Sequence, residues 1–147
     1  MNLRKATCKD APMLYCWFCD EGTRRYSISS NTPSWDDHCA WLKEKLAART
    51  CQIYIGTDEE REIGVLRFEA VGTEHTISIT IAPSCRGRGY GTALLSMGIH
   101  HPSCPHPLTA YILPVNHSSR RLFEKTGFLL QGSHLFSGKE FLRYEYP

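Results

Sequence analysis

Residues 85 to 95, CRGRGYGTALL, combine glycines and arginines and then begin an apolar, helix-like pattern. Glycine has no side chain, so an anion can approach the backbone N–H groups of such a loop directly. The first N–H groups of a helix are unpaired and lie at the positive end of its dipole, which favours negative charge. Arg86 and Arg88 add charge-assisted contacts. The loop therefore predicts a site for a phosphate or pyrophosphate.

Two other phosphate-binding motifs do not fit this loop. A P-loop needs a lysine followed by serine or threonine, which is missing here. A dinucleotide fingerprint needs G-x-G-x-x-G early in a βαβ unit, and the glycine spacing is different. On spacing alone, a solvated turn with incidental arginines is an equal alternative.

The cysteines and histidines form two groups that could bind metal. The seven cysteines are odd in number and scattered, which indicates reduced thiols in a cytoplasmic protein. Cys16 and Cys19 form one C-x-x-C, and the segment HHPSCPHP (residues 100 to 107) brings histidines near Cys104. A structural zinc site needs four ligands. No second C-x-x-C follows Cys16 and Cys19, and residues 100 to 107 look like a proline-rich loop between elements, so we expect no metal.

The bulk composition excludes several classes of protein. The 147 residues fit one domain, 1–147, and 41% hydrophobic residues suffice for a core. An apolar run long enough for a membrane span and an apolar N-terminal signal region are both missing. The net charge of +2 is too small to argue for nucleic acid. We therefore expect a cytoplasmic monomer or homodimer that binds neither membrane nor nucleic acid.

Hydrophobic periodicity divides the chain into strands and helices. Asp10 is predicted as the N-cap of a first helix and Ser34 as the N-cap of a second. Asn116 opens a later helix, which Gly127 ends. The order predicts an α/β (α+β) sandwich, with about four helices covering a mixed, mostly antiparallel sheet of about seven strands. The expected strands are 3–7, 51–57, 63–71, 75–83, 107–113, 128–136 and 140–146, and the expected helices are 10–20, 33–49, 90–100 and 116–127.

Two motifs in this order resemble one family. Arg86-x-x-Gly89-x-Gly91 resembles the coenzyme A signature of the GNAT superfamily of N-acetyltransferases. The downstream segment N-x-x-S-x-x-x-F-x-x-x-G-F, residues 116 to 128, is similar to the second motif of that superfamily. The resemblance covers nearly the whole chain. It implies the GNAT fold, an acetyl-CoA-dependent N-acetyltransferase and no metal cofactor.

The resemblance also implies where the coenzyme lies. The strand ending at Ile81 should splay away from strand 107–113, so that its backbone pairs with the pantetheine arm. The amides from Arg86 to Thr92 should hold the pyrophosphate, and Arg120 or Arg121 should reach the adenosine phosphates. Phe123 should pack beside the thioester. The expected coenzyme contacts are Ile79, Ile81, Arg86, Gly87, Arg88, Gly89, Tyr90, Gly91, Thr92, Asn116, Ser119, Arg121 and Phe123.

The acid that protonates the leaving thiolate is not evident. Many relatives carry a tyrosine at the position of Phe123, and phenylalanine has no proton to give. Tyr90, Tyr111 or water can substitute, or the thiolate can leave unprotonated, because a thiol pKa of about 8.5 makes it a fair leaving group.

The remaining catalytic roles are also open. A base should take the proton of the attacking amine, and Glu69 and a water held by Ser78 are equal candidates. The tetrahedral oxyanion needs a donor, and a strand N–H near Ile79 or Thr80 can serve. The expected catalytic residues are therefore Ser78, Glu69 and Thr80.

Three aromatic residues indicate an acceptor site. Trp35, His38 and Trp41 share one face of a helix by their spacing of three. They either pack into the core or form a platform for a sugar or nucleotide. The H-x-x-W pair, followed by YIG and EIGVLRFE, resembles acetyltransferases of nucleotide-linked amino sugars, such as those of the pseudaminic acid pathway. Transfer to protein N-termini or ribosomal proteins, and an acetyl-CoA sensor without transfer, are the alternatives.

Overall fold

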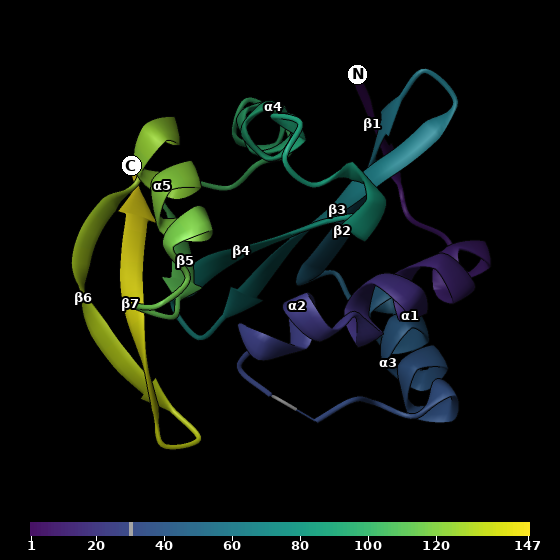
Figure 1. Ribbon diagram of the computed structural model, residues 1–147, viewed down its shortest axis with the longest axis horizontal. Helices are drawn as coiled ribbons and strands as arrows, with labels where there is room; N and C mark the ends of the chain where they lie inside the picture. The colour runs from purple at the N-terminus through teal and green to yellow at the C-terminus, as the bar shows by residue number, and fades with distance from the viewer. Residues whose placement is uncertain (30) are drawn as a thin grey trace.

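In the computed structural model, which describes residues 1–29 and 31–147, a seven-stranded sheet runs through the molecule in the order β1-β2-β3-β4-β5-β7-β6. Neighbouring strands are antiparallel, except that β4 and β5 are parallel. The predicted mixed, mostly antiparallel sheet is therefore confirmed (Figure 1). The strands are β1 (Asn2–Lys5), β2 (Cys51–Asp58), β3 (Arg61–Val71), β4 (Glu74–Ile81), β5 (Leu108–Ile112), β6 (Leu129–Phe136) and β7 (Lys139–Tyr146).

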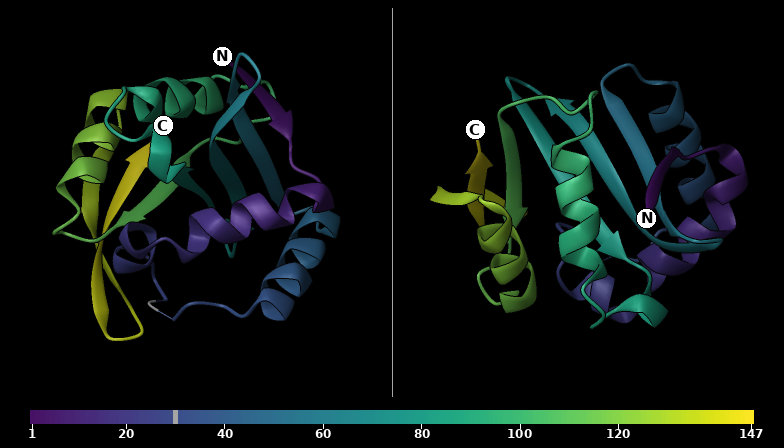
Figure 2. Two further views of the ribbon diagram at one scale, coloured as in Figure 1. Left: turned by 45° about the vertical axis from the view of Figure 1, so that its right-hand side comes forward. Right: turned by 90° about the horizontal axis from the view of Figure 1, so that it is seen from above.

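Helices cover both faces of this sheet. Two consecutive residues of β3 contact helices on opposite faces, because successive side chains of a strand point to opposite faces of the sheet. Leu66 faces α4, where a Cβ on Gly98 would lie 2.5 Å from it, and Arg67 stacks over Trp41 of α3 at 5.3 Å. The views of Figure 2 show α4 and α5 on one face and α1 to α3 on the other. The helices are α1 (Ala11–Cys19), α2 (Glu21–Arg25), α3 (Trp35–Ala47), α4 (Tyr90–Ile99) and α5 (His117–Thr126).

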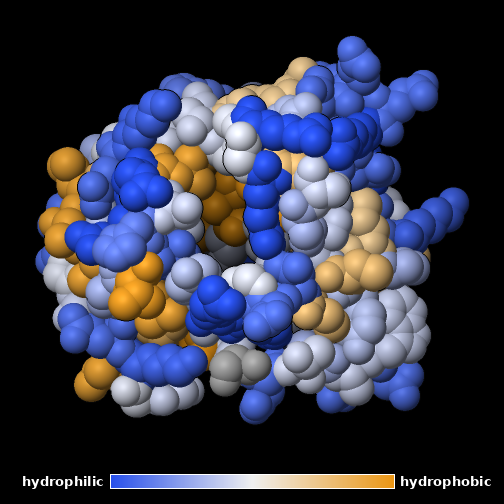
Figure 3. All heavy atoms as spheres, in the orientation of Figure 1, coloured by the Kyte–Doolittle hydropathy of each residue, from blue (hydrophilic) through white to orange (hydrophobic). Residues whose placement is uncertain are grey.

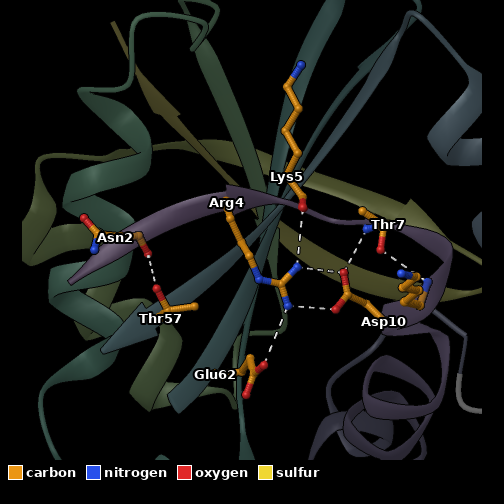
Figure 4. A network of polar contacts seen from close by, with 8 residues as sticks. Asn2, Arg4, Lys5, Thr7, Asp10, Thr57 and Glu62 are labelled. Atoms are coloured by element: carbon orange, nitrogen blue, oxygen red, sulfur yellow. Dashed lines mark hydrogen bonds and ion pairs between the residues drawn. The ribbon is translucent and has the colours of Figure 1, made fainter. Parts of the chain in front are cut away.

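The N-terminus of α1 differs from the expectation. Asp10 occupies the N-cap position, but its side chain does not cap α1. It accepts hydrogen bonds from Arg4 at 2.8 and 2.9 Å and from the Thr7 backbone N–H at 2.8 Å (Figure 4). The predicted N-cap position is confirmed, but the side-chain capping bond is not formed, because Arg4 on β1 offers a bidentate, charge-assisted partner, which is stronger than a neutral capping bond.

The other two predicted caps are confirmed. The Ser34 side chain accepts from the Asp37 N–H at 3.1 Å, and the Asn116 side chain accepts from the Ser119 N–H at 3.3 Å. Gly127 ends α5 with a left-handed φ of +113°. These short local signals are sufficient because capping depends on residues within one turn.

One helix was not predicted. The short α2 follows α1 directly, and the Asp20 side chain caps it by accepting from the Thr23 N–H at 3.2 Å. The structure therefore has five helices in its described residues, compared with about four expected. Five residues carry too little periodicity to be recognised in sequence. None of the helices in residues 1–29 and 31–147 is long and apolar enough to cross a membrane.

The core lies between the sheet and the helices on both faces. Leu14 of α1 and Leu94 of α4 are fully buried on opposite sides, and Tyr144 is fully buried under α5. Burying a leucine side chain is worth about 1.5–3 kcal/mol. These contacts hold the rigid frame in which β4 and β5 are fixed relative to each other.

Candidate active site

The parallel strands β4 and β5 touch at only one point. Thr76 and Thr109 form the bridge, after which the two strands part. The N–H of Ala82 donates to the Ile63 carbonyl of β3 at 2.9 Å. Antiparallel pairing alternates, so Ser78 and Thr80 also direct their backbone groups to β3. The intervening residues Ile79 and Ile81 therefore direct their N–H and C=O groups into the gap, as the resemblance implied.

The gap continues into a cavity of about 850 Å³. In Figure 3 this face is hollowed, with apolar residues in its depth and hydrophilic residues around its mouth. The cavity is lined from both faces of the sheet, by helices α1 to α3 on one face and by α5 on the other. Its walls also include residues of β2, β3, β4, β5 and β7.

The glycine-rich loop lies at the start of α4. Gly87 and Gly89 have φ values of +74° and +80°, which L-residues with a side chain rarely adopt. An added Cβ at either position would meet no described heavy atom within 4 Å. The loop therefore presents bare backbone to open space beside the N-terminus of α4, which fits an anion.

Gly91 also has a packing role. Its φ is not positive, and an added Cβ would lie 3.3 Å from Leu122 of α5. The absence of a side chain at Gly91 therefore lets α4 and α5 approach each other. The N–H of Thr92 lies in the same first turn of α4.

Arg86 connects this loop to α2. Its guanidinium donates to Asp20 Oδ2 at 2.8 Å and to Thr23 Oγ1 at 3.0 Å. Hydrogen bonding to Arg86 is the main reason that the pKa of the Asp20 carboxyl lies below its ordinary value. Arg88 is exposed on the same loop. Arg86 therefore ties the wall of the cavity to the loop, and Arg88 is the more accessible of the two cations.

Tyr90 does not lie where an acid for the thiolate would be needed. Its hydroxyl donates to Asp58 Oδ2 of β2 at 2.7 Å, and the residue does not line the cavity. The alternative in which Tyr90 replaces the missing tyrosine is not supported by this placement. Asp58 lies more than thirty positions away in sequence, so the contact could not be read from local patterns.

The start and inner face of α5 line the cavity as expected. Asn116, Ser119 and Phe123 all contribute to its wall. Phe123 is 3% exposed and packs edge-on against Phe128, with ring centroids 4.8 Å apart. The structure places Phe123 as a packing residue next to the gap.

Of the two arginines on α5, Arg121 is the more available. Arg120 donates to the Tyr144 hydroxyl and to the Pro114 carbonyl, both at 3.2 Å. Arg121 is exposed and makes no hydrogen bond or ion pair within the described residues. This favours Arg121 for the adenosine phosphates.

The structure distinguishes between the two candidate bases by their positions relative to the cavity. Ser78 and Thr80 line the cavity, but Glu69 does not. Glu69 pairs with Lys45 and, at 3.5 Å, with Arg67. Two cations already hold this carboxylate outside the cavity, so its position does not support a role as the base. Thr80 directs its backbone to β3, which leaves the Ile79 N–H as the better oxyanion donor.

The aromatic face of α3 lies against α1. His38 is buried, and its Nε2 lies 3.0 Å from the Ala11 carbonyl. Burial lowers the pKa of His38, so the ring stays neutral near pH 7. His38 and Trp41 line the cavity, whereas Trp35 is 43% exposed and lies outside it, against Tyr15. His38 and Trp41 therefore take part both in core packing and in the wall of the cavity, and Trp35 takes part in neither.

Sequence reasoning missed two cations of the cavity, Arg67 of β3 and Arg24. Arg24 of α2 lines it and donates to the carbonyls of Ser29 and Asn31, both at 3.2 Å. Its Nε is buried and has no partner in the part of the chain that the structure describes. The available signal was the run TRR, which lay in a segment without predicted structure.

Among the described residues, neither Cys16 and Cys19 nor the segment of residues 100 to 107 forms a cluster of metal ligands. Across residues 1–29 and 31–147, no group of three or more His, Cys, Asp or Glu side chains is placed to hold a metal ion.

Comparison with known proteins gives one consistent result. A model of the acetyltransferase (GNAT) domain matches residues 1–129. Aminoglycoside acetyltransferase AAC(6')-Ib with coenzyme A is similar in structure, with a TM-score of 0.84 and 21% identity over 99% of this chain and 93% of that one. Among curated proteins no match was found.

Two further solved structures share the fold. Spermidine N-acetyltransferase from Vibrio cholerae, with CoA and spermine, has a TM-score of 0.86 and 15% identity, covering 99% of this chain and 94% of that one. Ribosomal-protein-alanine N-acetyltransferase from Brucella melitensis has a TM-score of 0.82 and 20% identity, covering 99% of each chain.

Proposed function

This chain belongs to the acetyltransferase (GNAT) domain family, and we propose that it acetylates the primary amine of a nucleotide-linked amino sugar. It is an acetyl-CoA-dependent N-acetyltransferase. The observation that carries the proposal is the cavity that passes between β4 and β5. A thioester entering from the side of the glycine loop and an amine entering from α3 can meet there.

In the proposed complex, the coenzyme extends the sheet along β4. The backbone groups of Ile79 and Ile81 pair with the pantetheine amides, as an added strand would. The loop from Arg86 to Thr92 holds the pyrophosphate, and Arg121 approaches the adenosine phosphates. Asn116, Ser119 and Phe123 line the path of the arm toward the gap.

The Ile79 N–H is the proposed oxyanion donor. It enters the gap next to Ser78, whose side chain lies in the cavity and can hold a water. A preorganised N–H directed at the developing charge stabilises the tetrahedral intermediate.

The charges of the cavity support an anionic acceptor. Its walls include the guanidinium groups of Arg24, Arg67 and Arg86 and the Asp37 carboxylate. Arg86 is paired with Asp20 and Arg67 with Glu69, so Arg24, whose buried Nε has no partner among the described residues, is the cation most available to an anionic acceptor. Like charges in a cavity of low dielectric repel, so a substrate with several ammonium groups is disfavoured. AAC(6')-Ib acts on aminoglycosides, and the Vibrio structure holds spermine; both are polycations, unlike the acceptor proposed here. The phosphates of a nucleotide-linked sugar complement these arginines.

Aromatic surface supports a sugar or base in the same space. Trp41 and Tyr26 both line the cavity, and Arg67 stacks over Trp41 at 5.3 Å. Aromatic faces pack against sugar rings and bases through large apolar contacts.

The test measures free thiol released from acetyl-CoA with a panel of amines. The panel contains a nucleoside-diphosphate-linked amino sugar, the same sugar without the nucleotide, spermine and a peptide with a free N-terminus. We expect the kcat/KM to be higher for the nucleotide-linked sugar than for any other amine of the panel. Preference for the peptide would favour transfer to protein N-termini, and binding of acetyl-CoA with no release for any amine would favour a sensor.

A further inference from the structure

A tyrosine stands where the two parallel strands part. Thr76 and Thr109 form the bridge, and two residues beyond them are Ser78 of β4 and Tyr111 of β5. Side chains two residues apart on a strand share a face, so Ser78 and Tyr111 both face the acceptor side, and both line the cavity. The Ile79 N–H enters the gap at the same level. The Tyr111 side chain therefore lines the cavity beside the gap, and its hydroxyl reaches back past the bridge to Glu74.

The hydroxyl of Tyr111 belongs to a row of polar contacts. It donates to Glu74 Oε2 at 2.5 Å, and Glu74 Oε1 accepts from Arg143 Nε at 3.2 Å. Arg143 also donates to Thr109 Oγ1 at 3.4 Å and to Glu145 Oε2 at 3.3 Å. These hydrogen bonds form a network that extends from Tyr111 in the cavity wall to Glu74 of β4 and Arg143 of β7. Arg143 fixes the orientation of the Glu74 carboxylate.

The neighbours of Tyr111 on the remaining strands are aromatic. Phe136 of β6 contacts its ring edge-on at 4.9 Å between centroids, and the His134 ring lies 6.0 Å away. Burial, and secondly the hydrogen bond to Glu74, raise the pKa of Tyr111 above its ordinary value. The hydroxyl therefore keeps its proton near neutral pH, which excludes a resting phenolate as the base.

We propose that Tyr111 and Glu74 form a proton relay for acetyl transfer, an inference that rests on the function proposed above. The amine nitrogen attacks the thioester carbon, and the C–N bond forms. As it forms, an amine proton passes to Tyr111 Oη, and the Tyr111 proton passes to Glu74 Oε2. The carbonyl oxygen becomes the oxyanion at the Ile79 N–H.

In the second half of the reaction, the relay moves protons in the opposite direction. When the tetrahedral intermediate collapses, the C–S bond breaks and the thiolate of coenzyme A leaves. The proton on Glu74 returns to Tyr111 while Tyr111 gives its proton to the sulfur. Amine and acetyl-CoA have then become amide and coenzyme A thiol, and the relay has returned to its starting state. Tyr111 thereby supplies the acid for the leaving thiolate that Phe123 cannot supply.

The chain contains a matched control for this pair. Tyr144 donates to Glu124 Oε2, also at 2.5 Å, but neither residue lines the cavity. Tyr144→Phe therefore removes the same kind of bond without touching the proposed relay. Its effect reports the structural contribution of a tyrosine–glutamate pair in this fold.

The experiment compares Tyr111→Phe, Glu74→Gln and Tyr144→Phe with the natural protein. Thiol release from acetyl-CoA is measured with the nucleoside-diphosphate-linked amino sugar and also with water alone, because hydrolysis needs the same proton removal. For Tyr111→Phe and Glu74→Gln we expect kcat to fall by at least about a hundredfold, the usual scale of general acid–base catalysis. The Kd for acetyl-CoA should stay within about threefold, or roughly 0.7 kcal/mol.

A solvent isotope measurement separates chemistry from structure. In mixtures of H2O and D2O, the single-turnover rate of the natural protein should depend on deuterium fraction along a curve, since two protons move together. This last measurement needs no variant and remains informative if a substitution prevents folding.

Several results would overturn the relay. These are a Tyr111→Phe or Glu74→Gln variant with near-natural kcat, a loss in Tyr144→Phe as large as in Tyr111→Phe, or a linear isotope dependence. If the natural protein releases no thiol with any amine or with water, the proposed function fails as well, and the two failures are thereby distinguished.

Discussion

Replacing Gly89 by alanine should weaken acetyl-CoA binding through the phosphate contact alone. The φ of Gly89 is +80°, and the added Cβ would meet no described heavy atom within 4 Å. The substitution therefore introduces no clash within the protein. It strains the backbone, and it places a methyl group where the loop presents its bare N–H groups to an anion.

The two effects have separate magnitudes. A left-handed conformation costs an L-residue about 1–2 kcal/mol. For a protein of this size, the melting temperature should fall by roughly 2–4 °C for each kcal/mol. Loss of one hydrogen bond to a charged group is worth about 1.5–3 kcal/mol, which weakens Kd by roughly 10- to 150-fold.

The assay is calorimetric titration with acetyl-CoA, and Gly72→Ala is the matched control. Gly72 lies between β3 and β4 with a φ of +61°, and its added Cβ is equally free of described neighbours. Both variants should lose similar stability, but only Gly89→Ala should lose affinity. With S-acetylpantetheine, which has no pyrophosphate, the two should behave alike. Equal acetyl-CoA affinities in the two variants would show that the loop does not bind the phosphates.

Three further outcomes are expected. Phe123→Tyr should change kcat by less than about tenfold, or roughly 1.4 kcal/mol, and Phe123→Ala should mainly weaken acetyl-CoA binding; a rise of several hundredfold for the tyrosine variant would refute the packing role. Asp10→Asn should lower the free energy of unfolding at pH 7 by about 1.5–3 kcal/mol through weakened bonds to Arg4. Because hydrogen bonding to Arg4 lowers the Asp10 pKa from 3.8, this difference is full above pH 3.8 and should shrink in urea titrations at lower pH. A strong chelator should change neither melting temperature nor turnover, and unfolding with release of stoichiometric zinc would contradict this.

The elements recognised from sequence are those with local signals. The strict alternation of β4, the N-cap of α5 at Asn116 and the stop at Gly127 depend on residues within a few positions of one another. The glycine-rich loop is recognisable for the same reason, since Gly87 and Gly89 lie directly before α4. These signals are sufficient to predict the order of the seven strands and of four of the five α-helices in the described residues, and the short α2 is the exception.

The errors involve side-chain partners that the local pattern does not indicate. Asp10 bonds Arg4, six residues away, instead of capping α1, whereas Tyr90 bonds Asp58 and Glu69 pairs with Lys45 across 32 and 24 positions. A side chain chooses among several possible partners according to which of them the fold brings close, and that information is not in the local sequence. The position of Tyr111 beside Ser78 depends likewise on the register of two strands joined through a distant crossover.

The sheet order has a consequence for how the molecule assembles. Strands β1 to β4 come from residues 2 to 81, and strands β5 to β7 come from residues 108 to 146. Each half is paired within its own stretch of chain, and Thr76 and Thr109 form the bridge between their strands. Because contacts between nearby segments form fastest, the halves should fold as separate cooperative units and join late. A pantetheine arm lying along the seam would then slow their separation, which would appear as acetyl-CoA-dependent protection of the amides at Ile79 and Ile81 in hydrogen exchange.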